Sequence, residues 1–485
     1  MRKLRLLAAL LLILAACAKK EGFVIFSTAR AQGRIQAPDD CFKKGSCGGF
    51  PALKNIYDSE TLPKIIVDLG NWAEDSPKGH LTSGSDVIAM MNAFPYTAAV
   101  PGITDINLPE KDFDRIIKNS QFPLIGTNLY TRSGERKAGI ENHSITTVNG
   151  HKIGIFSVLL ANPKRPESQK NYARFRVEKG SYDANLAINA LKRDGAEIII
   201  MLLSVNSSDQ LDKGYYRDFI NQVKRANIII TDDPDVKKTF RSGNTWIIPA
   251  GTENKRVSRA EITFNAENGK ISAVKAKTID IDPIKYKENA DLHLLAIKFQ
   301  IEEKKHFAKK IGTLKIPLPL ESENVPVLAN YASDCIRAWA RTVVSIMPSN
   351  EPAGSFLDVN VSLSDLYRAF PKDSSIVFVK IRGENLIEAL KSLNPDHFTM
   401  SGIKVFYDKD GKFEKAELNN GQLKPDKIYQ IAVPDSMINE ESRLLLANAA
   451  EFANSKHPTR DVMRWCISGK HVFQPYMARI IKGGR

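Results

Sequence analysis

Acidic side chains follow several apolar runs in the first half of the chain. Asp68 ends "KIIVD", Asp105 follows "VPGIT", and Asp232, Asp233 and Asp235 follow "ANIIIT". Carboxylate oxygens at neighbouring strand ends are the ligands that Mg²⁺ or Ca²⁺ prefers. These aspartates could hold one divalent cation, although aspartate at a strand end is more often a turn residue.

The loop after the first apolar run carries different side chains. "FVIF" at 23–26 predicts a buried strand, and small polar residues end it. Many phosphate-cleaving enzymes place a metal-binding Asp and His directly after such a strand, but Arg30 and Gln32 stand there in this chain. No histidine occurs between His151 and His293. The loop after the first predicted strand therefore offers a cation and an amide in place of metal-binding side chains.

Other catalytic patterns are also missing from the sequence. The chain has no GXSXG, Walker or Rossmann fingerprint and no CxxC pair. His80 and His143 lie in predicted loops away from the aspartates. We expect surface or hydrogen-bonding roles for both histidines.

The cysteines fit an exported protein, because an oxidising compartment permits disulfides. Cys41 and Cys47, in "CFKKGSC", close a short loop and form the best candidate pair. The pairing of Cys335 and Cys466 stays open. Only the short loop between Cys41 and Cys47 supports a redox or electron-transfer role.

The N-terminus predicts export and lipidation. Three basic residues precede "LLAALLLILAA", an apolar stretch too short to span a membrane. It ends in "LAAC", which resembles the lipobox of bacterial lipoproteins, in which Cys17 is acylated; the alternative is an ordinary secretory signal. We therefore expect a lipoprotein signal peptide at 1–16 and a lipidated tether at 17–22. This predicts a protein anchored in the bacterial cell envelope on the periplasmic side, and the absence of an acidic residue at 18–19 favours the outer membrane.

The formal net charge of the chain is +14. An exported basic protein is attracted to an anionic leaflet. The basic residues are scattered and no dense run alternates with aromatics, so no nucleic-acid polymer is expected as a partner. The expected partners are the membrane, through lipidated Cys17, and an unknown envelope protein or small ligand.

The chain of 485 residues is too long for one core, so about two or three domains are expected. From 23 to 280, apolar strand-like runs alternate with amphipathic stretches, which predicts a layered α/β domain. Residues 281–312 are charged and nearly free of Gly and Pro, which predicts a linking helix. Residues 313–485 mix helices and strands and predict an α+β domain.

One amphipathic stretch, "SYDANLAINALKRDG", predicts a helix of the first domain. Its residues Ala184, Leu186, Ala187 and Leu191 are expected on the core face, and Gly195 ends the helix.

The order of these segments is similar to that of the exported 5'-nucleotidase and UDP-sugar hydrolase family. The matching segments include "GGFPAL", "FPLIGTNL", "NGHKIGIFSV", "SENVPVLANYASDCIRA" and "VSLSDLYRAFPKDSSIVFVKIRGENLIEAL". The resemblance covers nearly the whole chain after the signal. It implies a four-layer calcineurin-like metallophosphatase sandwich, a linking helix and an α+β 5'-nucleotidase C-terminal domain, and hence a degenerate member of that family.

The same resemblance implies positions for the ligands of a two-metal site. At these positions stand Arg30, Gln32, Asn71, Ile103, Thr104, Val205, Asp233 and Asp235. Asp68 and Asp105 remain as residual carboxylates. The permanent charge of Arg30 would repel a divalent cation at close range.

The substrate positions implied by the resemblance have changed as well. A Gly-Gly-x-Arg loop is expected near 349–354, where "SNEPAG" has no arginine, and "INEESRLL" at 438–445 replaces a loop with a stacking aromatic. Phe398 matches the opposite stacking aromatic, with core packing as the alternative.

The sequence therefore predicts a non-hydrolytic binding protein with no catalytic residue, no bound metal and no cofactor. The alternative is a metal-dependent phosphohydrolase that acts on nucleotides or related phosphoesters and holds a divalent ion in a rebuilt site.

Overall fold

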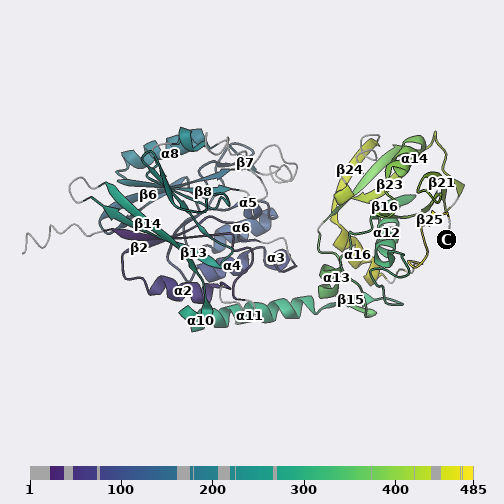
Figure 1. Cartoon of the computed structure of the whole chain (residues 1–485), viewed down its shortest axis with the longest axis horizontal. Helices are drawn as coiled ribbons and strands as arrows, with labels where there is room; N and C mark the ends of the chain where they lie inside the picture. Colours follow the sequence, from purple (N-terminus) through teal and green to yellow (C-terminus); the bar gives the residue numbers. More distant parts are fainter. Residues whose placement is uncertain are drawn as a thin grey trace, which may run out of the picture. The chain divides into compact units, whose positions relative to one another are not determined.

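The computed structural model describes most of the chain. The described residues are 22–37, 47–73, 77–160, 175–178, 180–205, 219–223, 226–265, 270–372, 374–419, 421–437, 449–469, 471 and 473–483. The chain divides into two compact units, Met1–Ile301 and Glu302–Arg485 (Figure 1).

Two six-stranded sheets form the first unit. The first sheet has the order β14 (Ile271–Asp280), β13 (Arg256–Phe264), β1 (Phe23–Ala29), β2 (Lys64–Asp68) and β3 (Tyr96–Ala99), and β12 (Gly251–Thr252) also pairs with β1. The second sheet has the order β10 (Phe240–Ser242), β11 (Thr245–Pro249), β9 (Ile228–Thr231), β8 (Ile198–Val205), β6 (His151–Leu160) and β5 (His143–Val148). A small ribbon pairs β4 (Leu129–Thr131) with β7 (Phe175–Val177).

Helices cover the outer faces of both sheets. They are α2 (Phe50–Asp58), α3 (Pro77–Thr82), α4 (Ser85–Met91), α5 (Ile103–Ile106), α6 (Glu110–Asn119) and α8 (Ser181–Arg193). Strand β1 shows how the layers arise, because successive side chains point to opposite faces. Phe23 and Ile25 pack between the two sheets, whereas Val24 and Phe26 pack under α2 and α4. The four-layer sandwich predicted from the sequence is confirmed.

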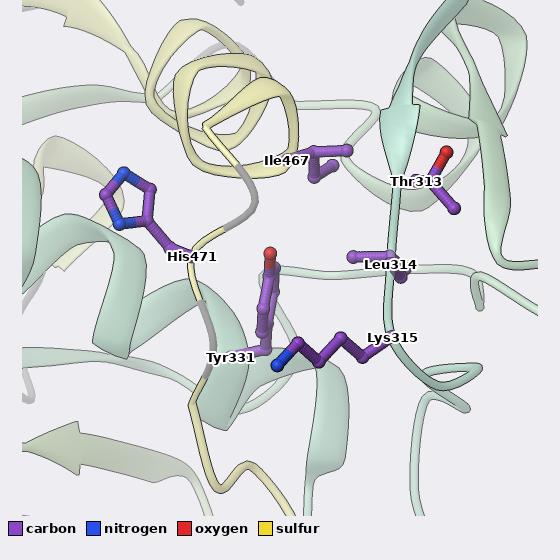
Figure 2. A pocket seen from close by; sticks show the side chains of 6 residues that line it. All are labelled: Thr313, Leu314, Lys315, Tyr331, Ile467 and His471. Atoms are coloured by element: carbon purple, nitrogen blue, oxygen red, sulfur yellow. The ribbon is translucent and has the colours of Figure 1, made fainter.

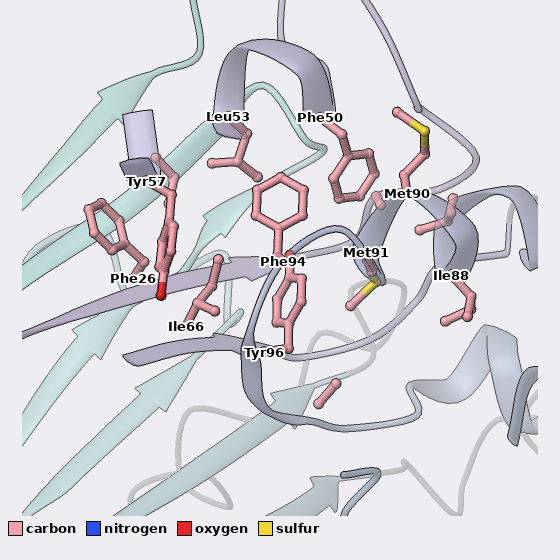
Figure 3. Close-up of a cluster of buried hydrophobic side chains, with 14 of the residues drawn as sticks. Phe26, Phe50, Leu53, Tyr57, Ile66, Ile88, Met90, Met91, Phe94 and Tyr96 are labelled. Carbon is pink, nitrogen blue, oxygen red and sulfur yellow. The ribbon is translucent and has the colours of Figure 1, made fainter. Parts of the chain in front are cut away.

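Aromatic rings fill the core outside the first sheet (Figure 3). Phe94 lies 5.9 Å from Phe50 and 5.8 Å from Tyr96, measured between ring centroids. Phe26 lies 5.6 Å from Tyr57. These contacts hold α2 and the turn after α4 on the strands that carry the site.

Helix α8 differs from its predicted pattern at one residue. Ala184, Ala187, Ile188 and Leu191 are buried against the second sheet, but Leu186 is 49% exposed. Residue 186 follows residue 184 by about 200° around the helix, so it faces away from the sheet.

The segment predicted as one linking helix, 281–312, contains three elements. It holds α10 (Pro283–Tyr286), α11 (Ala290–Phe307) and the start of β15 (Lys310–Thr313). Lys287, with φ +53°, ends α10, and Asn289 caps α11 through its Oδ1 and the amide of Leu292. No helix within the described ranges is long and apolar enough to cross a membrane.

The second unit is an α+β domain. Its main sheet has the order β19 (Phe398–Ser401), β16 (Val344–Pro348), β23 (Ile428–Pro434), β18 (Ser375–Arg382) and β24 (Ala449–Pro458). A second sheet has the order β22 (Gly421–Gln422), β21 (Phe413–Leu418), β20 (Ile403–Tyr407) and β25 (Ile480–Lys482), and β15 pairs with β17 (Asn360–Ser362). The helices are α12 (Val327–Ala340), α13 (Leu363–Ala369), α14 (Gly383–Ser392), α16 (Thr459–Ser468) and the 3₁₀ turn η2 (Asp435–Met437).

A disulfide joins two helices of the second unit. Cys335 of α12 and Cys466 of α16 are bonded, with their Cα atoms 5.7 Å apart. Both cysteines are fully buried. The structure thus gives the pairing that the sequence left open.

Candidate functional site

The predicted site residues of the first unit gather at the carboxyl ends of its parallel strands. Thr28 of β1 is in register with Asp68 of β2, and β8 ends at Val205 beside Asp232, which follows β9. This is the edge of an α/β sheet at which ligands bind.

The guanidinium of Arg30 reaches across this edge. Its Nε donates to Oδ2 of Asp232 at 2.9 Å, and its Nη2 donates to the carbonyl oxygens of Val205 (3.2 Å) and Asp232 (2.7 Å). The side chain of Arg30 is 11% exposed and that of Asp232 is fully buried. A fixed cation of the chain itself therefore joins the ends of β1, β8 and β9.

The carboxylate at this point belongs to Asp232, which the sequence named among the strand-end aspartates but which the family resemblance did not place at a ligand position. Asp233 and Asp235 were assigned to the last pair of ligand positions, but Asp232 is the buried one. Asp235 is exposed, and its amide donates to Oδ1 of Asp233 at 2.9 Å, which is the hydrogen bond of an Asx turn. Strand β9 ends at Thr231, so Asp232 follows it directly and stays buried, whereas the later residues enter the turn.

Asp68 is buried inside a set of donors. Its Oδ1 accepts hydrogen bonds from the amide of Gly70 and from Nε1 of Trp72, both at 2.7 Å. Its Oδ2 accepts from the hydroxyl of Thr28 at 2.6 Å. Burial, and to a smaller extent the charge of Asp105, raise the pKa of Asp68 to about 7, although the hydrogen bonds from these donors lower it.

The carboxylate of Asp105 accepts hydrogen bonds from four backbone amides and, at 3.5 Å, from the hydroxyl of Thr104. Oδ1 accepts from the amides of Trp72 (2.8 Å) and Ala73 (3.0 Å). Oδ2 accepts from the amides of Asn71 (2.7 Å) and Gly102 (2.8 Å). Burial raises the pKa of Asp105 to about 6. Its carboxylate fastens the loop after β2 to the start of α5, which is a structural role.

Asn71 stands where the resemblance expects a metal-bridging carboxylate. Its Oδ1 accepts from the amide (3.1 Å) and hydroxyl (3.2 Å) of Thr104, whereas Ile103 is buried in an apolar cluster. Asn71 and Arg30 have left-handed backbones, with φ of +60° and +56°, and so does Gln32 with +47°. Non-glycine residues in this region cost about 1–3 kcal/mol each and cluster at functional sites.

Gly70 allows the loop after β2 to lie close to the segment that precedes α5. Its φ is +79°, and a Cβ atom built on it would lie 2.1 Å from the carbonyl oxygen of Val100 and 2.3 Å from the amide nitrogen of Gly102. A larger residue would push the loop after β2 away from α5. The position therefore requires glycine.

These residues do not fit a divalent cation. A cation site needs oxygen or imidazole groups that are free to turn toward the ion. The carboxylate of Asp68 accepts three hydrogen bonds. That of Asp105 accepts four from backbone amides and one from the hydroxyl of Thr104. That of Asp232 pairs with Arg30 and accepts from the amide of Val205. No group of three or more His, Cys, Asp or Glu suited to a metal occurs among the described residues. Asp68, Asp105 and Asp232, which the sequence indicated as possible ligands of one Mg²⁺ or Ca²⁺ ion, thus make separate structural contacts.

Burial and the salt bridge act in opposite directions on the ionisation of Asp232, and burial has the larger effect. Burial raises its pKa to about 6, while the charge of Arg30 and the hydrogen bonds from Arg30 and Val205 lower it. The sequence indicated Asp232 only as one of several aspartates that follow apolar runs, and nothing in it predicted the pairing with Arg30.

The substrate positions that the resemblance implies in the second unit take part in contacts within that unit. Phe398 begins β19, is 2% exposed and belongs to the main core of this unit, so the core-packing alternative describes its position. In the loop at 349–354, Glu351 is buried and its Oε2 accepts from the hydroxyl of Ser436 at 2.8 Å. The segment 438–445 lies outside the described residues.

The two histidines predicted in loops lie in regular elements. His80 belongs to helix α3, and His143 begins strand β5, where it pairs with Phe156 of β6. His143 is half-buried and contacts Asn142 through Nδ1 at 3.1 Å. Its hydrogen-bonding role is as predicted, but its place in a loop was wrong.

The two remaining cysteine predictions fall largely outside the described residues. Cys47 is disulfide-bonded, but its predicted partner Cys41 and the anchor Cys17 both lie outside the described residues.

Comparisons with known proteins agree with this architecture. Residues 310–444 match the family model described as 5'-nucleotidase, C-terminal domain. A trifunctional nucleotide phosphoesterase, YfkN of Bacillus subtilis, is 27% identical over 144 residues, which are 28% of this chain and 10% of that protein. The chain thus matches about a tenth of the length of this curated relative.

Two solved structures match nearly the full length. The putative 5'-nucleotidase of Staphylococcus aureus has a TM-score of 0.66 at 13% identity, covering 96% of this chain and 100% of that one. The 5'-nucleotidase precursor of Thermus thermophilus has a TM-score of 0.55 at 13% identity, covering 96% and 99%. The matched segment 310–444 therefore belongs to the 5'-nucleotidase C-terminal domain family, and the chain has the fold of the 5'-nucleotidases, a calcineurin-like phosphoesterase domain followed by this C-terminal domain.

Proposed function

We propose that this protein is a lipid-anchored envelope protein of the 5'-nucleotidase family that does not hydrolyse phosphoesters and acts by binding a small ligand or another envelope protein. The ion pair between Arg30 and Asp232 carries the proposal. A guanidinium has a fixed charge and its own hydrogen-bond directions, so it holds the strand ends together but supplies neither a Lewis acid nor a base near neutral pH.

The hydrogen bonds of the acidic side chains support the same conclusion. A general base must have an acceptor directed at the substrate. The oxygens of Asp68 and Asp105 accept from the protein's own donors, and Thr104 pairs with Asn71. The strand ends thus keep the arrangement of a phosphoesterase fold, but their polar side chains form hydrogen bonds and an ion pair within the protein.

The test of this proposal combines a hydrolysis assay with a metal measurement. The purified protein is assayed against nucleoside monophosphates with Mn²⁺, Zn²⁺, Mg²⁺ and Ca²⁺, and bound metal is measured by elemental analysis. We expect no turnover above that of a mock purification and less than one metal ion per chain.

Variants separate real from contaminating activity. Turnover from a contaminant would be equal in the native protein, Asp68→Asn and Asp105→Asn. Turnover that disappears in either variant would show that the protein is the alternative, a metal-dependent phosphohydrolase with a rebuilt site.

Membrane anchoring is tested separately. The lipobox-like "LAAC" supports acylation of Cys17, and the basic chain supports contact with an anionic leaflet. The Thermus thermophilus neighbour is described as a precursor, which agrees with export. We expect Cys17→Ser to move the protein from the membrane fraction, with the outer membrane favoured, to the soluble fraction. Equal membrane association of both forms would contradict the lipid anchor.

A further inference from the structure

The second unit contains a cavity that lies apart from the strand ends described above. Its volume is about 360 Å³, within the range of sites for small molecules. It is lined by Thr313, Leu314, Lys315, Tyr331, Ile467 and His471 (Figure 2). All of these residues belong to the second unit, so the cavity is formed by that unit alone.

Tyr331 brings an unsatisfied hydroxyl group into this cavity. The residue lies on α12 and is 4% exposed. Its Oη atom is buried and has no hydrogen-bond partner within the part of the chain that the structure describes. In Figure 2 its ring stands between His471 on one side and Leu314 on the other. A buried polar group without a partner is destabilising, so it is rare unless something else satisfies it.

The hydroxyl is available as a donor. Burial, and then the charge of Asp334, raise the pKa of Tyr331 to about 12, so the group stays protonated near neutral pH. Asp334 does not occupy it, because its own oxygens accept from Ser401 at 2.5 Å and from Arg479 at 2.9 Å. The cavity therefore presents an O–H group to a guest acceptor.

Lys315 gives the cavity a positive charge. Its side chain is exposed, and in Figure 2 it extends from the segment after β15 toward Tyr331. Within the described ranges no carboxylate forms an ion pair with it. The negative charge of Asp334, which acts on Tyr331, is offset by Arg479 and Arg337. The surroundings favour an anion over a cation.

The walls are apolar on the remaining sides. Leu314 is 8% exposed and Ile467 is 1% exposed. The ring of Tyr331 is itself fixed by an edge contact with Phe473, 5.8 Å between centroids. A charged donor at the opening, a neutral donor inside and apolar walls suit a guest with an anionic head and a small apolar body.

We propose that this cavity binds a small organic carboxylate, with the carboxylate accepting a hydrogen bond from Oη of Tyr331 and pairing with Lys315, and with its apolar body against Leu314 and Ile467. The site is independent of the function proposed for the first unit.

Isothermal titration of the full chain with benzoate tests this directly. Benzyl alcohol tests the need for the charge, and inorganic phosphate tests the need for the apolar body. We expect saturable binding of benzoate at millimolar concentration or below, and at least about tenfold weaker binding of the other two probes. Absence of saturable benzoate binding, or equal binding of phosphate, would overturn the proposal.

Three variants locate the binding. Tyr331→Phe removes one hydroxyl and Lys315→Met removes one charge, and each should weaken benzoate about tenfold, as a hydrogen bond or ion pair to a charged group predicts. Lys412→Met, in the exposed turn between β20 and β21, is the matched control and should leave binding unchanged. Native affinity in both cavity variants would overturn the assignment.

Stability gives a second readout that does not depend on the probe. Without ligand, Tyr331→Phe should raise the midpoint of thermal unfolding by about 2–4 °C, since it removes an unsatisfied group and keeps the ring. Benzoate should raise the midpoint of the native protein and not that of the variant. A lower midpoint for Tyr331→Phe would show that the hydroxyl already has a partner in the folded protein, which would overturn the proposal.

Discussion

Arg30 and Asp232 are 202 residues apart in sequence and form a buried ion pair of 2.9 Å between Nε and Oδ2. The pair connects the loop after β1, in the first sheet, with the end of β9, in the second. Most of the contact between the two sheets is apolar, and Ser204 of β8 adds a hydrogen bond from its Oγ to the carbonyl oxygen of Leu69 at 3.0 Å. The ion pair of Arg30 therefore helps to fix the strand ends at the edge where a ligand would enter.

Removing Arg30 should therefore destabilise the first unit strongly. Arg30→Met leaves Asp232 buried without its partner, and we expect a loss of about 3–5 kcal/mol in the free energy of unfolding. Urea denaturation measures it. Arg34→Met is the matched control, because the pair of Arg34 with Glu253 is partly exposed, with side chains 38% and 41% accessible, and should lose less than about 1 kcal/mol. The double variant Arg30→Met/Asp232→Leu should recover most of the loss. Equal losses in the two single variants would contradict a special role for the buried pair.

The stability of the protein should fall as the pH rises from about 4 to 7. The folded-state pKa values of Asp68 (about 7), Asp105 (about 6) and Asp232 (about 6) lie above the ordinary value. In this window the folded state binds more protons than the unfolded state, so stabilisation is present at the acidic end and is lost as the pH passes each folded-state pKa. Each group contributes at most about 1.4 kcal/mol per pH unit.

Thermal unfolding at pH 4 to 8 measures this slope. Asp68→Asn is neutral at every pH and can still accept from Gly70 and Trp72, so the slope between pH 6 and 7 should become shallower. An unchanged slope would mean that Asp68 is ionised throughout.

The disulfide between Cys335 and Cys466 should stabilise the second unit. It closes a loop of 131 residues, and breaking such a bond costs about 2–5 kcal/mol. Calorimetry of the Cys335→Ala/Cys466→Ala variant should show a lower unfolding midpoint for this unit. Added reductant should lower the midpoint of the native protein and leave that of the variant unchanged; a midpoint insensitive to both treatments would contradict the prediction.

Phe398 should contribute to stability through core packing. Phe398→Ala should cost about 3–5 kcal/mol, because the side chain is 2% exposed in a packed core. Phe452→Ala, on β24 with 67% exposure, removes the same side chain from the surface and should change the free energy of unfolding by less than about 0.5 kcal/mol. Similar values for the two variants would show that Phe398 is not held by the core.

The layered architecture could be predicted from the sequence because parallel strands buried on both faces read as apolar runs. An apolar run does not show at which residue its strand ends. Whether Asp232 or Asp233 is buried depends on β9 ending at Thr231, and a shift of one residue exchanges the two faces of a strand.

Contacts between segments that are distant along the chain could not be predicted from the sequence. The pairing of Cys335 with Cys466 requires α12 and α16 to lie side by side, and the cavity at Tyr331 requires β15 to lie next to both helices. Within "ANYASDC" the tyrosine reads as an ordinary core residue, since nothing in the sequence shows whether its hydroxyl has an acceptor.

The positive charge at the strand ends of the first unit is built into the polypeptide by Arg30. A chelator cannot extract it, a shortage of metal cannot leave it unfilled, and acidity within the physiological range cannot discharge it. This architecture should consequently be complete as soon as the chain has folded, with no step of metal loading.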